Sequence, residues 1–128
     1  MSVEGLFFLL AAFICFAVGL AHSIFGERWL ANTLIPNINA LQDDRDIVRI
    51  IRTVWHLLTI IYWAIATLFF LMSQSPLTTV AVTTVFAIMF LLTAIFTAVF
   101  SGGRFIAWTA FVILSAIAWG EVTWGEFF

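Results

Sequence analysis

The chain has 128 residues, of which 64% are hydrophobic, 17% aromatic and 9% charged, and its mean hydropathy is +1.16. A soluble domain carries roughly 45–50% apolar and about 25% charged residues, because its surface faces water. The composition therefore excludes a soluble globular domain. It also excludes a disordered chain, which needs low hydrophobicity and high charge. We predict a polytopic membrane protein that forms a single membrane domain over residues 1–128.

The few basic residues and the single cysteine exclude two further classes of protein. The net charge is −2 and all five basic residues are arginine, so the chain offers no broad cationic surface and we expect no nucleic-acid partner. Cys15 is the single cysteine, so no disulfide framework can form within the chain. The lipid bilayer is the first partner that the composition predicts.

Four apolar segments have about the length that a bilayer demands. A hydrocarbon core about 30 Å thick needs ~20 residues of helix, each rising 1.5 Å. The segments span residues 5–25, 47–72, 77–100 and 105–119. The fourth is short, so it either ends at the interface or gains length through Trp124. We predict an all-α integral membrane bundle of four transmembrane helices.

The connections between these segments contain residues that end or begin helices. Pro76 closes a short polar turn and suits the start of the third helix. Gly102 and Gly103 permit the chain to reverse before the fourth. The connection over residues 26–46 is the longest.

Apolar residues recur at helical spacing in the first part of this long connection. We therefore expect the first helix to continue or restart along the membrane surface before Pro36. Asp43 and Asp44 look like N-terminal caps of the second helix, with Asp46 in its first turn.

The arginines predict the orientation of the chain. Four of them lie in or beside the first connection and one lies in the third: Arg28, Arg45, Arg49 and Arg52, and then Arg104. The N-terminal tail, the second turn and the C-terminal tail contain no arginine. Cytoplasmic loops of membrane proteins carry the excess of basic residues. We therefore expect both odd-numbered connections in the cytoplasm and both termini to be extracytoplasmic.

Ionisable residues inside a membrane are costly, and they are therefore the best indicators of a functional site. On the second helix, six residues fall within an arc of about 80° at 100° per residue: Arg45, Arg49, Arg52, His56, Thr59 and Trp63. This stripe enters the bilayer near Arg52 and reaches His56 one turn deeper. It should face the bundle interior or a hydrated groove, because lipid cannot satisfy it.

The first helix carries a complementary face of small and polar residues within an arc of roughly 100°: Ala12, Cys15, Gly19, His22, Ser23 and Gly26. His22 lies about one turn from the cytoplasmic end, at the same expected depth as His56. We predict one cluster at the cytoplasmic end, which we call the predicted cluster: His22, Glu27, Arg52, His56 and Arg104.

Three hypotheses account for the predicted cluster. In the first, Glu27 pairs with Arg52 or Arg104, and the cluster only ties the helices together. In the second, His22 and His56 ligate a haem b iron, and Arg52 and Arg104 hold the propionates. In the third, His22, Glu27 and His56 bind a divalent metal ion or relay protons, although the neighbouring arginines would repel a cation.

No catalytic residue is predicted, and the sequence does not point to an enzyme. The chain lacks a Gly-rich phosphate loop, a His-Glu-x-x-His motif and a Gly-x-Ser-x-Gly motif. Ser23 follows His22 directly, but neighbours on a helix point about 100° apart, so these two do not form a nucleophile and its base.

The strings Ala21-His22-Ser23-x-x-Gly26-Glu27 and Arg52-x-x-Trp55-His56 resemble those of short four-span proteins of bacterial inner membranes, most of them uncharacterised. The resemblance covers the first two helices. It implies a multi-pass protein of the cell inner membrane and no particular activity.

We therefore expect a small integral inner-membrane protein whose cytoplasmic-side cluster binds a small ligand, haem or a metal ion, or ties a membrane complex together. The alternative is an accessory or structural membrane subunit without a ligand, in which the cluster is a buried salt-bridge network. A homo-oligomer or another membrane protein is expected to pack on the small-residue face of the first helix or on the threonine face of the third, around Thr83, Thr93 and Thr97.

Overall fold

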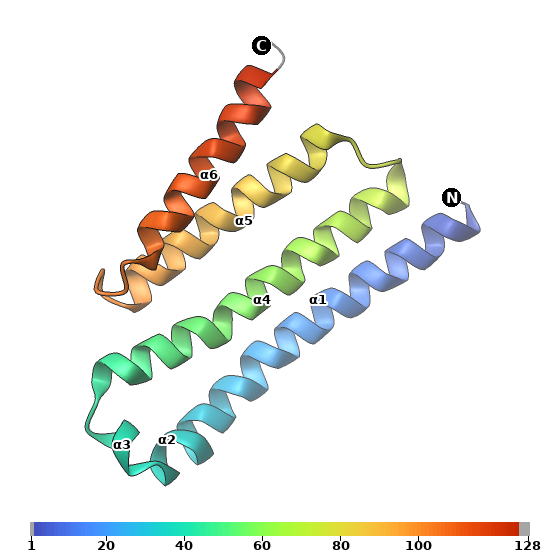
Figure 1. The fold of residues 1–128 in the computed structure, drawn as a ribbon. Helices are drawn as coiled ribbons and strands as arrows, with labels where there is room; N and C mark the ends of the chain where they lie inside the picture. Colours follow the sequence, from blue (N-terminus) through green and yellow to red (C-terminus); the bar gives the residue numbers. More distant parts are fainter. Residues whose placement is uncertain (1, 126–128) are drawn as a thin grey trace.

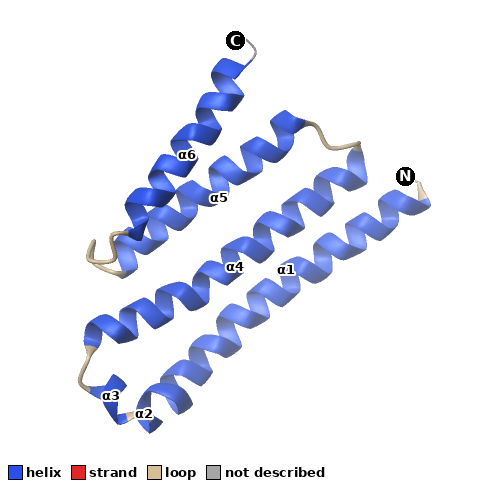
Figure 2. Cartoon of the chain, viewed as in Figure 1, coloured by secondary structure: helices blue, strands red, loops and turns tan. Residues whose placement is uncertain are grey.

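The structure is a computed structural model that describes residues 2–125, and this part of the chain is helical and contains no strand (Figure 2). The helices are α1 (Val3–Trp29), a π-helical turn η1 (Leu30–Leu34), α2 (Ile35–Asn37), α3 (Asn39–Gln42), α4 (Arg45–Gln74), α5 (Thr79–Phe100) and α6 (Ala107–Trp124).

Four helical segments are long and apolar enough to cross a membrane, as predicted: Val3–Asn37, Arg45–Gln74, Thr79–Phe100 and Ala107–Trp124. The first helix does continue, through η1 into α2, but it includes Pro36, before which it was expected to end, because a proline in the first turn of α2 is tolerated. The fourth span does gain length through Trp124, and its 18 residues rise ~27 Å, close to the thickness of a bilayer core.

Side-chain caps explain where three of these helices begin. The Ser2 hydroxyl accepts from the backbone N–H of Gly5 at the start of α1. Asp44 caps α4, as predicted, and accepts from the N–H groups of Asp46 and Ile47 at 3.1 Å each. Thr78 caps α5 by accepting from the N–H of Ala81.

Two predicted boundary residues lie elsewhere. Asp43 ends α3 rather than capping α4. Pro76 lies in the turn before α5 rather than at its start, because the Thr78 hydroxyl supplies the cap that begins the helix two residues later.

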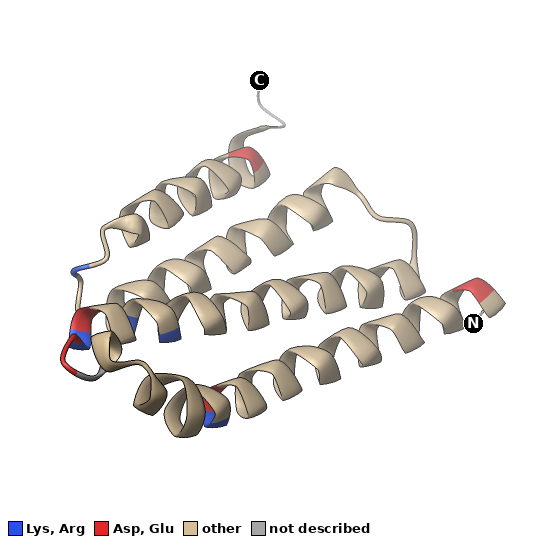
Figure 3. Ribbon diagram, turned by 60° about the horizontal axis from the view of Figure 1, so that its bottom comes forward, with Lys and Arg blue, Asp and Glu red and all other residues tan. Residues whose placement is uncertain are grey.

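The long helices lie in the order of the sequence, with α1 against α4, α4 against α5 and α5 against α6 (Figure 1). Contacts are extensive within the α1–α4 and α5–α6 pairs and fewer between α4 and α5. Both termini lie at one end of the molecule. The five arginines lie towards the opposite end, where the α1–α4 and α5–α6 connections turn (Figure 3). We call this the arginine end.

Small residues allow α1 to approach α4 closely. The buried residues of α1 recur every seventh position: Gly5, Ala12, Gly19 and Gly26. A Cβ atom on Gly19 would lie 3.0 Å from Trp63 and Tyr62, and one on Gly26 would lie 1.8 Å from Trp55 Nε1. The small-residue face predicted as an oligomer interface is therefore covered by α4 within the same chain.

The threonine face of α5 is also used inside the chain. Thr93 and Thr97 are buried, and the nearby α6 residue Ser115 donates a hydrogen bond of 2.8 Å to the carbonyl of Ala87. A hydroxyl that bonds to a backbone carbonyl across two helices is a common way to hold membrane helices together.

The outward faces of the helices are apolar. Several of the largest hydrophobic side chains are more than 60% exposed: Phe7, Phe13, Val99, Ile106 and Ile117. On α4 the most exposed large hydrophobic side chain is Val54, at 52%. Exposed apolar side chains of this kind are suited to lipid and not to water. The protein is thus an all-helical, multi-pass membrane protein.

Candidate functional site

His56 is the centre of a hydrogen-bonded chain that joins α1 to α4 near the arginine end. Its Nδ1 atom lies 2.6 Å from Ser23 Oγ, and its Nε2 atom lies 2.9 Å from Glu27 Oε2. The other carboxylate oxygen of Glu27 lies 3.1 Å from Arg52 Nε, in an ion pair that lacks hydrogen-bond alignment. Three members of the predicted cluster, Glu27, Arg52 and His56, are therefore brought together, with Ser23 added.

Helical periodicity explains how these four residues meet. Ser23 and Glu27 are four positions apart on α1, and Arg52 and His56 are four apart on α4, so each pair lies on one helix face. The contacts of His56 with Ser23 and Glu27 show that the two faces oppose each other. The His56 side chain is 18% exposed, whereas Glu27 and Arg52 are 39% and 41% exposed.

The chemistry of the groups sets the direction of the hydrogen bonds. A carboxylate only accepts, so the Nε2–H of His56 donates to Glu27. In the neutral imidazole the other nitrogen, Nδ1, is then an acceptor, and the Ser23 hydroxyl donates to it. Arg52 keeps a positive charge beside the carboxylate. Ser23 therefore donates a hydrogen bond to His56, and His56 donates one to Glu27.

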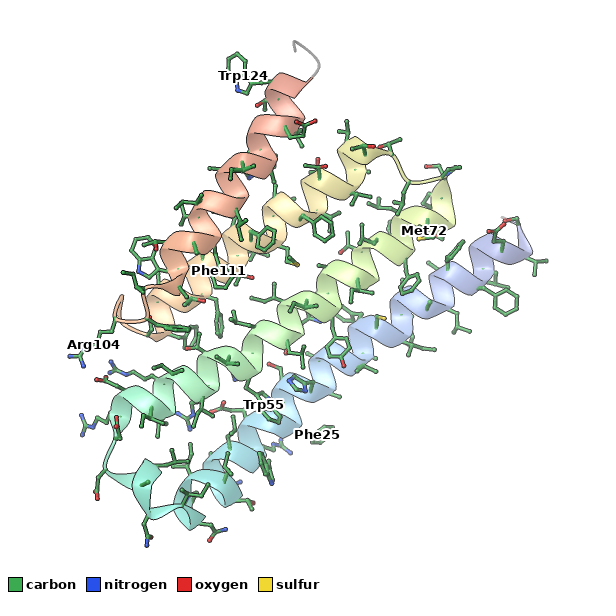
Figure 4. All side chains as sticks on the ribbon, in the orientation of Figure 1. Phe25, Trp55, Met72, Arg104, Phe111 and Trp124 are labelled. Carbon is green, nitrogen blue, oxygen red and sulfur yellow. The ribbon has the colours of Figure 1, made fainter. Side chains whose placement is uncertain are left out.

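His22 lies at the same level as His56, as predicted, but it belongs to a separate contact. Its ring stacks on Trp55 with centroids 4.7 Å apart and an interplanar angle of 5°. His22 Nε2 lies 3.1 Å from the Trp55 carbonyl, and Trp55 Nε1 donates to the His22 carbonyl at 3.1 Å. Figure 4 shows the Trp55 side chain between α4 and α1. This reciprocal pair closes the helix interface beside Gly26.

Arg104 does not join the predicted cluster. Its Nη1 donates to both carboxylate oxygens of Asp46, at 2.8 and 2.9 Å, and its side chain is 70% exposed. Figure 4 shows it at the outer tip of the arginine end. The residue lies in the α5–α6 connection, where it reaches the first turn of α4 but not Glu27. Sequence alone does not position that connection.

The haem and metal hypotheses find no support in these contacts. Both ring nitrogens of His56 have partners, and His22 stacks on Trp55 rather than sharing a cavity with His56. Within residues 2–125, no three His, Cys, Asp or Glu side chains come close enough to hold a metal ion. The arrangement fits the first hypothesis, in which Glu27 pairs with Arg52.

A groove of about 510 Å³ lies between α4 and α5 and reaches α1. Most of its wall is apolar, with side chains from both helices: Ile60, Ala64, Val85, Met89, Leu92 and Phe96. Its polar lining includes Ser23, His56 and Thr59. The stripe predicted on the second helix does face this groove with His56, Thr59 and Trp63, although the groove is far less polar than expected.

Most of the polar lining of the groove lies at one end; Thr67, further along α4, also lines the groove, but its hydroxyl donates to the carbonyl of Trp63 at 2.8 Å. The ring of His56 lies 5.9 Å from that of Phe96, so the polar end is the arginine end of α5. The α5 lining extends from Phe100 back to Val85, which corresponds to ~22 Å of helix. Thr59 is 4% exposed, and its hydroxyl has no hydrogen-bond partner in the described part of the chain.

The sequence analysis missed the contact between Ser23 and His56 and the contribution of α5 to the groove. The sequence spacing places Ser23 and Glu27 on one face of α1, and Arg52 and His56 on one face of α4, but which faces meet depends on the rotation of α1 against α4.

Comparison with known proteins adds no relative: no protein-family model, no curated protein and no solved structure matches this chain.

Proposed function

We propose that this is an inner-membrane protein that binds a membrane-dissolved amphiphile in the groove between α4 and α5. The polar head of the ligand lies at Ser23 and His56, and its apolar tail extends along α5. In this proposal the arginine end is cytoplasmic and both termini are extracytoplasmic, in agreement with the positions of the arginines.

The observation that carries the proposal is that the polar groups of the groove lie mainly at its His56 end, while Thr67 further along has its hydroxyl bonded to a backbone carbonyl. Ligand sites are typically cavities of about 300–1,000 Å³ with mainly apolar walls and a few polar groups that fix orientation. This groove has that size and that lining. Thr59, next to His56 along the groove, has an enclosed hydroxyl that finds no partner among residues 2–125, so a hydrogen-bonding group is left for a ligand.

The depth of the polar end also fits an amphiphile. The 30 residues of α4 rise ~45 Å, which exceeds a bilayer core of about 30 Å by ~15 Å. If this excess lies at the arginine end, Arg45 to Arg52 extend into the headgroup region and His56 lies just inside the core. A lipid-like molecule has its own polar head at that depth.

The test compares two tryptophan substitutions on α5. Leu92 lines the groove and is 50% exposed, whereas the adjacent Leu91 is 40% exposed and faces away from it. Each protein is purified in mild detergent from its native membrane, and the bound lipids are extracted and quantified by mass spectrometry. We expect Leu92→Trp to lose a co-purifying amphiphile that Leu91→Trp retains. Equal lipid content in both variants would refute the proposal.

The second candidate is an accessory subunit in which the charged residues only tie helices together. Glu27 already pairs with both His56 and Arg52, and this pairing favours the second candidate. It predicts no bound amphiphile in the wild-type protein and a loss of stability in Glu27→Gln. The absorption spectrum and metal content of the same preparation test the haem and metal hypotheses.

A further inference from the structure

We infer that Ser23 is a nucleophile for acyl transfer, with His56 as its general base and Glu27 as the positioning residue. The inference rests on the proposed function, because the substrate is an ester or thioester of the amphiphile that occupies the groove. Ser23 and His56 both line that groove, so a carbonyl group at its polar end would meet the hydroxyl directly.

The distances have the values that an activated serine requires. A nucleophile is recognised by a base within about 2.6–3.2 Å and by a third group that orients the base. Ser23 Oγ lies 2.6 Å from His56 Nδ1, and His56 Nε2 lies 2.9 Å from Glu27 Oε2. The Glu27 carboxylate favours the tautomer in which Nδ1 is free to accept the serine proton.

The direction of the Ser23 hydroxyl is informative. A serine inside a helix commonly bonds to the carbonyl four residues back, which leaves it inert. The hydroxyls of Thr53, Thr67 and Thr84 do so here, with distances of 2.7, 2.8 and 2.7 Å. Ser23 instead points across to a histidine on another helix.

The reaction balances with water as the second substrate. Ser23 Oγ attacks the carbonyl carbon and passes its proton to His56 Nδ1, and the bond to the alcohol or thiol breaks as that group takes the proton from His56. His56 then takes a proton from a water molecule, which attacks the carbonyl carbon of the acyl-serine. The bond to Ser23 Oγ breaks as His56 returns the proton to that oxygen, so a fatty acid leaves and the Ser23 hydroxyl is restored.

Thr59 is the side chain placed to stabilise the oxyanion. Backbone N–H groups inside helices are already bonded, so an oxyanion within this bundle needs a side-chain donor. Thr59 lies three residues after His56, lines the groove and has an enclosed hydroxyl without a partner among residues 2–125. A rotation about its Cα–Cβ bond would turn this hydroxyl towards the groove.

The first experiment uses a long-chain alkyl fluorophosphonate and p-nitrophenyl palmitate on the purified protein in detergent. The fluorophosphonate should form an Oγ–P bond at Ser23 with loss of fluoride, located by peptide mass spectrometry. The ester should release nitrophenolate. We expect Ser23→Ala to abolish both signals and His56→Gln to slow them by about 10²-fold or more. Arg104→Gln, which changes an exposed pair outside the site, should leave both rates unchanged.

Two matched threonine variants separate catalysis from folding. Thr59→Val and Thr97→Val each remove an enclosed hydroxyl without a partner, so neither should lower stability. Thr97 does not line the groove. We expect Thr59→Val alone to slow ester cleavage, by about 10²-fold. Glu27→Gln should lower kcat and leave KM for the ester unchanged, because it acts through His56.

The outcomes distinguish this inference from the function on which it rests. If the wild-type protein holds its amphiphile but neither reagent reacts at Ser23, the nucleophile is refuted and the binding function stands. If no amphiphile is held and Ser23 is unreactive, both are refuted. Reaction at a different serine, or full reactivity in folded His56→Gln, would also overturn the inference.

Discussion

The close approach of α1 and α4 at Gly26 leads to a quantitative prediction for Gly26→Ala. The added methyl carbon would lie 1.8 Å from Trp55 Nε1 and 2.4 Å from Cε2, whereas an ordinary contact begins at 3.4 Å. The indole must therefore move by at least 3.4 − 1.8 = 1.6 Å, or the helices must separate. Either change breaks the 3.1 Å bond from Trp55 Nε1 to the His22 carbonyl.

The expected loss of stability combines three terms. Overpacking costs about 1–3 kcal/mol. The loss of one interhelical hydrogen bond in a membrane protein costs about 0.6 kcal/mol. Alanine is a better helix former than glycine, which offsets these costs by about 1 kcal/mol. We therefore expect Gly26→Ala to lower the free energy of unfolding by about 0.6–2.6 kcal/mol.

The assay is equilibrium unfolding by titration with sodium dodecyl sulfate in mixed micelles, followed by far-ultraviolet circular dichroism. The matched control is Gly120→Ala on α6, where an added Cβ meets nothing within 4 Å. Gly120→Ala should be as stable as the wild type or more so, by up to about 1 kcal/mol. In a Trp55→Phe background, which removes Nε1, the cost of Gly26→Ala should shrink. Equal stability of Gly26→Ala and Gly120→Ala would refute the close packing described here.

Three further predictions concern the rest of the chain. Arg104→Gln should change the free energy of unfolding by no more than about 1 kcal/mol in the same titration, because the arginine and its aspartate partner are exposed; a larger loss would place this pair inside the packing. Thr97→Val should be neutral or stabilising, because the enclosed hydroxyl that it removes has no partner among residues 2–125, and a loss above about 1 kcal/mol would reveal one. In a Cys15→Ser background, a membrane-impermeant maleimide should label Ser75→Cys from outside intact spheroplasts and Asn39→Cys only after lysis; the reverse pattern would invert the topology.

Much of the architecture follows from the order of residues along the chain. Twenty or so apolar residues in a row can satisfy their backbone only as a helix within lipid, so the four spans were predictable from local composition. The ends of the helices were harder to predict than the spans, as Pro76 and Asp43 illustrate. Where a helix begins depends on which nearby hydroxyl or carboxylate caps it.

The candidate site was likewise predictable from the sequence only in part. The face shared by Arg52, His56 and Thr59, and the equal depth of His22 and His56, were predicted from the helical repeat and the antiparallel order of the spans. That repeat is a property of one helix, so it cannot tell which side chains on two helices meet. The pairing of His56 with Ser23, and of His22 with Trp55, depends on the distance and rotation between α1 and α4.

Composition and periodicity thus determine that this chain is a four-span helical membrane protein with its arginines at one end, because both act over short stretches of chain. Only the tertiary structure decides that Arg104 pairs with Asp46 instead of Glu27, that the small residues of α1 pack against α4, and that α5 completes a groove over His56. These contacts join residues far apart in sequence, and they depend on how far one helix lies from the next, a distance set by the side chains packed between them.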